Sequence, residues 1–204
     1  MNKSNGSWLK NVLTKHNPQI IYMIRKSFVV TALLILVNAI AFGQSYTPTD
    51  AGSKVRFVIK NFGINTGGTF DGLAGSITFD PSNIATASFN VNVDAKTVDT
   101  DIESRDNHLR KEEYFDVEKY PKLSFRSTKI TATNKEGYFY MFGIITIKNV
   151  SKEISFPFTQ TSKDGGILFE GEFKLNRRDF GVGGKSFSMS DELKVELSVF
   201  AKKN

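Results

Sequence analysis

Cysteine is absent from this 204-residue sequence, and tryptophan and proline are scarce, with one Trp and five Pro. Without cysteine there is no disulfide framework, zinc–thiolate site, thiol nucleophile or cysteine for lipid attachment. Hydrophobic residues make up 40% and charged residues 24% of the chain, which is typical of a globular protein. This composition excludes wholesale disorder, a collagen-like repeat and a multi-span membrane protein, and the length predicts one domain, or one domain with a tail.

Carboxylates are absent from residues 1–43, although this segment holds five of the 27 basic residues. The remainder therefore has 22 basic and 21 acidic residues, a net charge of +1 in place of the +6 of the whole chain. This near balance removes the electrostatic basis for nucleic-acid binding, so no nucleic-acid partner is expected.

The N-terminal segment has the pattern of a secretory signal peptide. Arg25 and Lys26 precede a mostly apolar run over residues 28–42, and Ala41 and Gly43 place small residues at the −3 and −1 positions of a cleavage site. Because a membrane span needs about 20 apolar residues, this shorter run predicts cleavage after Gly43, with a retained anchor as the alternative.

The predicted domain organisation is therefore an extension and signal peptide at residues 1–43, followed by one domain at residues 44–204. Met23 is an alternative start, because residues 1–22 are polar and unpatterned. The predicted location of the domain is the periplasm or the extracellular space. Trp8 precedes the domain, whereas 16 of the 18 Phe lie within it, since only Phe28 and Phe42 come earlier.

A period of two dominates the pattern of apolar residues in the domain, as in half-buried antiparallel strands. The clearest segment is 85–93, and similar ones lie at 55–59, 77–79, 123–125, 138–147, 154–158, 169–175 and 193–199. The glycine-rich stretch 67–75 predicts a bend. Eight such strands with short turns predict an all-β fold, either an up-and-down barrel or a sandwich.

One segment, residues 98–120, lacks this alternation and is rich in charge. Asp99 or Thr100 is a candidate N-cap for a short helix that runs to Leu109. The segment is therefore predicted to be a helical crossover between strands.

Several motifs resemble those of one known family, and the resemblance covers about residues 46–202. The motifs, in chain order, are Ser53–Ile59, Gly68–Ile77 with Asp80, Arg105–Leu109 (RDNHL), Tyr114–Val117 (YFDV), Tyr120–Ser127 (YPKLSFRS), Gly143–Lys148 with Val150–Ile154, and Arg178–Gly183 (RDFGVG). Each motif is weak by itself, but their order over one domain is specific. The sequence is similar to the YceI-like family of polyisoprenoid-binding, lipocalin-like periplasmic proteins, and departs from it mildly at Tyr114 and Asn149.

The resemblance implies an eight-stranded antiparallel up-and-down barrel with one short helical crossover and a lipid chain in its lumen. It implies a non-catalytic protein that sequesters or carries an isoprenoid, quinone-like or fatty-acid-like lipid. The abundance of Phe agrees, because aromatic side chains line apolar pockets. The alternative is a structural or interaction barrel with a packed Phe-rich core and no ligand.

The candidate ligand-binding residues are the apolar side chains of one strand parity, together with residues of the crossover. They are Phe57, Ile59, Phe70, Phe79, Phe89, Val91, His108, Leu109, Phe115, Phe125, Phe156, Phe158, Phe169 and Phe173. Small barrels fill their interiors with side chains, so the sequence leaves open which of these line a cavity and which seal the barrel.

Polar candidates gather in two motifs, Arg105–Asp106 and Arg178–Asp179. In the crossover, one hypothesis is a mouth that gates lipid entry, with His108 or Arg105 near a polar head group. The alternative is an Arg105–Asp106 pair that pins the crossover by hydrogen bonds to the backbone. The same alternatives stand for Arg178 and Asp179.

Catalysis and metal binding are not expected. Asp101, Ser104 and His108 share a helical face, but Asp101 and His108 would lie about 10 Å apart, too far for a catalytic triad. Asp99, Asp101 and Glu103 have EF-hand-like spacing without the Gly and Glu that the loop requires. The expected partner is a hydrophobic lipid, with no other cofactor, and contact with a membrane surface and a homodimer both stay open.

Overall fold

The computed structural model describes residues 43–204. The predicted signal peptide and the alternative start at Met23 lie outside the described residues. Within residues 43–204, no helix has both the length and the apolar character needed to cross a membrane.

Ten antiparallel strands form a single sheet. The strands are β1 (Ser45–Pro48), β2 (Lys54–Asn61), β3 (Ile64–Phe70), β4 (Ala74–Thr78), β5 (Ser88–Asp94), β6 (Lys122–Ala132), β7 (Tyr138–Ile147), β8 (Val150–Lys163), β9 (Gly166–Asn176) and β10 (Met189–Lys203). The other elements are the helix α3 (Glu103–Leu109) and the 3₁₀ turns η1 (Ile84–Thr86), η2 (Ala95–Thr97) and η3 (Arg177–Phe180).

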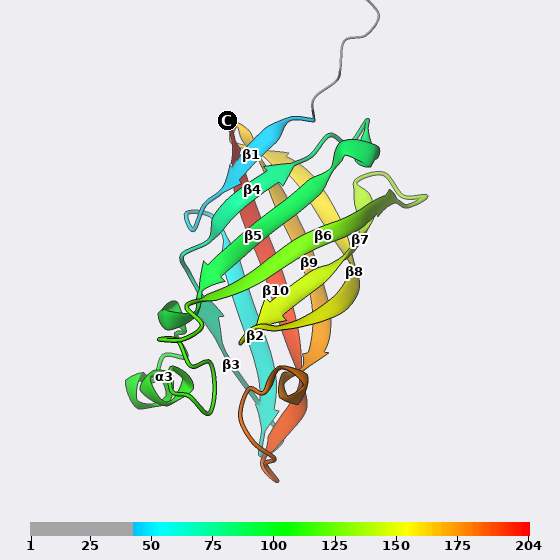
Figure 1. Ribbon diagram of the computed structural model, residues 1–204. Helices are drawn as coiled ribbons and strands as arrows, with labels where there is room; N and C mark the ends of the chain where they lie inside the picture. The colour runs from blue at the N-terminus through cyan, green and yellow to red at the C-terminus, as the bar shows by residue number, and fades with distance from the viewer. Residues whose placement is uncertain (1–42) are drawn as a thin grey trace, which may run out of the picture. The chain divides into compact units, whose positions relative to one another are not determined.

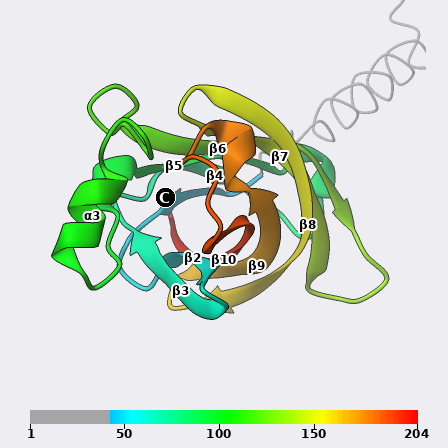
Figure 2. The same cartoon turned by 90° about the horizontal axis from the view of Figure 1, so that it is seen from below.

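The sheet closes into an eight-stranded barrel in the order β1-β4-β5-β6-β7-β8-β9-β10, because β10 also pairs with β1 (Figures 1 and 2). β1 and β2 continue one another along the same edge of β10, with β1 at Ala201–Lys203 and β2 at Met189–Ser198. The all-β fold class and the eight-stranded barrel predicted from the sequence are confirmed, and the sandwich alternative is wrong.

Residues 67–75 combine the end of the strand β3, up to Phe70, with the predicted bend at residues 71–73, where Gly72 has φ of 72°, and the start of β4 at Ala74. A Cβ on Gly67 would lie 2.0 Å from the Phe57 carbonyl oxygen, and one on Gly68 would lie 2.4 Å from that of Asp99. The glycines therefore permit a close approach of backbones. Asp99 belongs to the crossover. Its backbone exchanges two hydrogen bonds, of 2.8 and 3.1 Å, with the backbone of Thr69 in β3.

The crossover between β5 and β6 contains the predicted short helix, α3, but its predicted N-cap is wrong. Ile102 occupies the N-cap position without a side-chain hydrogen bond. Asp99 instead accepts a hydrogen bond from the backbone N–H of Asp101, and Thr100 bonds to Asp106. Figure 2 shows α3 beside β3, and Figure 1 shows both at the lower end of the barrel.

A dense aromatic core fills the opposite end, near β1 and β4. Phe79 is fully buried and makes edge-to-face contacts with Phe89, Phe139, Phe158 and Phe169, at ring-centroid distances of 5.2–6.2 Å. Such contacts add to the free energy gained from burial alone. This end of the barrel is therefore closed by side chains.

Candidate functional site

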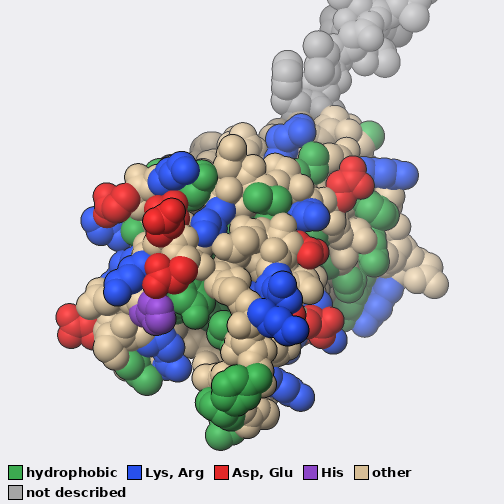
Figure 3. All heavy atoms as spheres, turned by 60° about the horizontal axis from the view of Figure 1, so that its bottom comes forward, with side chains coloured by type: hydrophobic (Ala, Val, Ile, Leu, Met, Phe, Trp, Pro, Cys, Tyr) green, Lys and Arg blue, Asp and Glu red, His purple; other side chains and the backbone are tan. Residues whose placement is uncertain are grey.

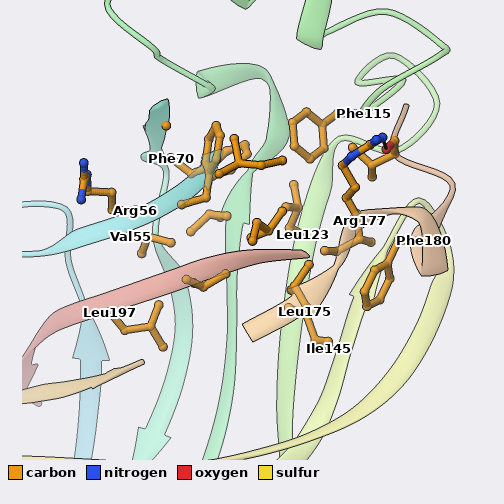
Figure 4. Close-up of a pocket in the computed structure, with 18 of the residues that line it drawn as sticks. Val55, Arg56, Phe70, Phe115, Leu123, Ile145, Leu175, Arg177, Phe180 and Leu197 are labelled. Carbon is orange, nitrogen blue, oxygen red and sulfur yellow. Dashed lines mark hydrogen bonds between the residues drawn. The ribbon is translucent and has the colours of Figure 1, made fainter. Parts of the chain in front are cut away.

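An apolar cavity of about 240 Å³ occupies the barrel between the aromatic core and the crossover (Figure 4). Packing defects are usually much smaller, and an apolar cavity of about 150 Å³ already binds benzene. This space is therefore large enough to hold part of an apolar ligand.

The cavity is elongated along β10. Its lining runs from Met189 to Val199 on this strand, and a strand rise of about 3.3 Å per residue gives a path of roughly 30 Å. Ile145 and Phe180 extend the wall toward η3, and Leu109 extends it toward α3. A long and narrow apolar space fits a linear chain better than a compact molecule.

Most of the predicted ligand-binding residues lie at the wall of this cavity. They are Phe57, Ile59, Phe70, Val91, Leu109, Phe115, Phe125, Phe156 and Phe173. In Figure 4, Phe70 and Phe115 lie at the crossover side, where their rings meet edge to face at 5.3 Å. Their contact with a ligand remains a prediction.

Four predicted residues do not line the cavity, namely Phe79, Phe89, Phe158 and Phe169. They share the inward parity of the lining residues but lie in the aromatic core, where neighbouring rings occupy the space around each of them. For these four, the sealing role that the sequence left open is the one that the structure supports.

His108 also lies away from the cavity. Its side chain is 54% exposed, and Nε2 lies 3.2 Å from Oε1 of Glu113. The backbone around Glu113 and the hydrogen bond with His108 hold the pKa of Glu113 below its usual value. The structure thus gives His108 a surface partner and does not place it near a head group in the cavity.

Arg105 and Asp106 do not pair with each other, and both bond to Thr100. The buried Asp106 carboxylate accepts hydrogen bonds from the Thr100 backbone N–H at 2.9 Å and from its hydroxyl at 2.5 Å. Arg105 donates from Nε to the Thr100 hydroxyl and from Nη2 to its carbonyl. These bonds favour the pinning hypothesis, although Arg105 and Thr100 also reach the cavity wall.

Arg177, which was not among the residues predicted from the sequence, is only 3% exposed and lines the cavity. It donates hydrogen bonds to the carbonyls of Ser190 and Val182 and to Asp191 Oδ1, each at 2.9 Å. This Arg therefore ties the η3 turn to the start of β10. The alternation of the strand could have predicted this position, because Arg177 follows the inward-facing Phe173 and Leu175 at intervals of two residues.

The predicted motif Arg178–Asp179 is not a pair. Arg178 is 45% exposed and contacts Asp191 at 3.4 Å, and Asp179 lies on the exposed side of η3. The physical reason is the 3₁₀ turn η3, which ends the strand alternation, so that Arg177 and Phe180 are buried and the two residues between them are exposed. Other lining residues absent from the prediction include Val55, Leu123, Ile145, Leu175, Phe180, Val182, Leu193, Val195, Leu197 and Val199.

Two of the arginines beside the cavity, Arg56 and Arg177, are paired with carboxylates, whereas Arg105 bonds to Thr100. Figure 4 shows the Arg56 side chain pointing away from the cavity, and its guanidinium lies 2.8 Å from Glu196. Hydrogen bonds from Lys194 and then Arg56 hold the pKa of Glu196 below its usual value. Among residues 43–204, no three His, Asp or Glu side chains gather as metal ligands.

The closed barrel and its elongated apolar cavity place the protein among lipocalin-like β-barrels. The family model of the YceI-like domain matches residues 46–201. A UPF0312 protein of Photorhabdus laumondii is 32% identical over 189 residues, which cover 87% of this chain and 97% of that protein. The chain therefore belongs to the YceI-like family.

Solved structures share the fold at low sequence identity. Burkholderia cenocepacia BcnA superimposes with a TM-score of 0.70 at 24% identity, over 74% of this chain and 98% of that one. A polyisoprenoid-binding domain from Saccharophagus degradans, implicated in plant cell wall breakdown, has a TM-score of 0.64 at 14% identity, over 79% and 99% of the two chains. Both likenesses concern the fold alone.

Proposed function

We propose that this protein is a non-catalytic binding protein that sequesters or carries a linear lipid, of the isoprenoid, quinone-like or fatty-acid-like class, inside the barrel. The observation that carries the proposal is the elongated apolar cavity, with its wall of Phe, Leu, Ile and Val side chains. The likeness to a polyisoprenoid-binding domain supports it. The signal-peptide pattern of residues 1–43 supports an action in the periplasm or outside the cell.

The physical basis is the transfer of hydrocarbon out of water. Each buried CH₂ group contributes about 0.8 kcal/mol, so one five-carbon isoprene unit gains several kcal/mol before the cost of ordering the chain. The buried guanidinium of Arg177 already donates hydrogen bonds to three oxygen atoms of the protein. A strong polar interaction between Arg177 and a ligand is therefore not expected. Affinity is therefore expected to increase with chain length.

The test is a titration of the delipidated protein with geranylgeraniol, a short-chain ubiquinone and palmitate, in the wild type and in Leu175→Trp. Leu175 lies in the cavity wall, and the larger indole would fill part of the free volume. The wild type is expected to bind, and Leu175→Trp is expected to have an affinity lower by at least about tenfold, because the indole excludes several methylene groups of the ligand from the cavity.

Phe142→Trp is the matched control, because Phe142 is 36% exposed on the outside of β7. The control should bind like the wild type. If the folded wild type binds none of the three probes, or if Leu175→Trp binds all of them unchanged, the carrier function is wrong and the packed structural barrel takes its place.

A further inference from the structure

Two loops at the crossover end of the barrel expose large apolar side chains. Phe62 and Ile64, at the β2–β3 turn, are 70% and 71% exposed, and Phe187, before β10, is 96% exposed. The loops are joined, because the Phe62 N–H donates to the Ser188 carbonyl at 2.7 Å and the rings of Phe62 and Phe187 lie 5.7 Å apart. We call Phe62, Ile64 and Phe187 the apolar tip.

Phe62 is an unfavourable residue at this position of the β2–β3 turn. It has φ of 48° and precedes Gly63 with φ of 76°, as in a two-residue type I′ turn, whose first position favours Asn. A bulky residue with positive φ is a conformational outlier, and its ring is also left in water. Such an unfavourable residue is best explained by a contact outside the fold.

The charged side chains of the two tip loops are both basic, and the nearest acidic residue on β10, Asp191, is paired with Arg177 and Arg178. Residues 59–69 and 180–190 contain Lys60 and Lys185 and no Asp or Glu. Both lysines are exposed, and neither forms an ion pair within residues 43–204. Figure 3 shows a group of hydrophobic side chains protruding at this end, with basic side chains beside it.

The apolar tip is also next to the cavity. Asn61 and Met189, which are paired across β2 and β10, both line the cavity and are sequence neighbours of the tip loops. Thr66 does so from β3. A surface that bound the tip would therefore lie at the end of the barrel through which a chain reaches the cavity.

We propose that the apolar tip docks on the surface of an anionic lipid bilayer. Phe62, Ile64 and Phe187 would enter the interfacial region, where aromatic and aliphatic side chains are favoured, and the two lysines would contact anionic head groups. The interpretation of docking as the step that loads or unloads lipid rests on the proposed function. The docking itself does not.

The test is cosedimentation of residues 43–204, which contain the complete closed barrel and its core, with vesicles of phosphatidylethanolamine and phosphatidylglycerol. Phe62→Asn combined with Phe187→Ser should weaken vesicle binding by at least about tenfold, since each exposed Phe that enters the interface loses contact with water. Lys60→Gln and Lys185→Gln should each weaken it about fivefold at low salt.

Stability separates this role from a structural one. Phe62→Asn should unfold at the same temperature as the wild type or higher, because Asn suits the turn, while it binds vesicles less. Tyr138→Ser, at the exposed β6–β7 turn, is the control variant and should bind vesicles normally.

Phe187→Trp adds a direct readout, because residues 43–204 contain no other Trp. Its emission should shift to shorter wavelength on anionic vesicles, whereas the emission of Tyr138→Trp should not. Absence of vesicle binding by the wild type would overturn the proposal. So would tip variants that bind vesicles normally, or tip variants whose only defect is the loss of a dimer in sedimentation, since the partner would then be a second copy.

The two proposals fail separately. Lipid titration in solution reports on the cavity and should be unchanged in the tip variants. Vesicle binding should be unchanged in Leu175→Trp. A protein that docks but takes up no lipid would refute the carrier function alone, and a protein that takes up lipid but does not dock would refute the docking alone.

Discussion

Phe79 and Phe125 both point into the barrel, yet the structure predicts that their replacement by Ala has different consequences. Phe79 is fully buried among four aromatic rings in the closed end. Phe125 lines the cavity, and its only aromatic neighbour within residues 43–204 is Phe156, at 6.0 Å. A side chain that faces empty space has fewer atoms in contact on that side, so its removal costs less.

The expected magnitudes follow from burial. Phe79→Ala should lower the free energy of unfolding by about 3–5 kcal/mol, the usual cost for a buried Phe. At about 2–4 °C per kcal/mol for a domain of this size, the melting temperature should fall by roughly 6–20 °C. Phe125→Ala should cost about 1–2 kcal/mol in the delipidated protein, because part of its surroundings is already vacant.

Urea unfolding of the delipidated proteins measures both costs, and lipid titration supplies the second comparison. Phe125→Ala should weaken lipid binding, whereas folded Phe79→Ala should bind lipid as the wild type does. Phe79→Leu, which retains most of the volume, serves if the Ala variant does not fold. Equal losses of stability at the two positions, or a selective loss of lipid binding in Phe79→Leu, would refute this division of the barrel.

Three further predictions concern polar groups. Arg177→Ala should cost about 2–4 kcal/mol in urea unfolding because the carbonyls of Ser190 and Val182 lose their buried donor, whereas the exposed Arg178→Ala should cost about 1 kcal/mol or less; similar costs would contradict the assignment. Asp106→Ala should lower the free energy of unfolding by about 1–3 kcal/mol by removing the acceptor of the Thr100 N–H, and an unchanged value would show that water replaces it. Because the folded-state pKa of Glu196 is lowered, its stabilising effect is present above its unfolded pKa of about 4.3 and is lost as pH falls through the lower folded value. The stability difference between wild type and Glu196→Gln should therefore shrink on acidification, and a constant difference would argue against it.

Much of the fold could be predicted from the sequence, because strand alternation identifies which side chains face inward. Val91 and Phe89 show the limit of this signal, since both face inward but only Val91 lines the cavity. Parity gives the side of the sheet and not the level along the barrel axis. That level depends on strand register, which is set by pairing between segments that are distant in the chain.

The glycine-rich β3 and the polar motifs were harder to predict for another reason. Gly67 and Gly68 resemble turn residues in sequence, and their role becomes apparent only when the backbones of Phe57 and Asp99 are placed against them. Similarly, nothing local shows that Arg105 and Asp106 both bond to Thr100. Such contacts are tertiary, so composition and spacing alone do not determine them.

The most direct test of the lipid-carrier account is native mass spectrometry of residues 44–204 purified from an exported preparation, with organic extraction of any bound molecule. The account predicts a stoichiometric adduct that solvent releases as an isoprenoid, a quinone or a fatty acid. A ligand-free mass that persists after incubation of the folded protein with all three lipid classes would contradict it.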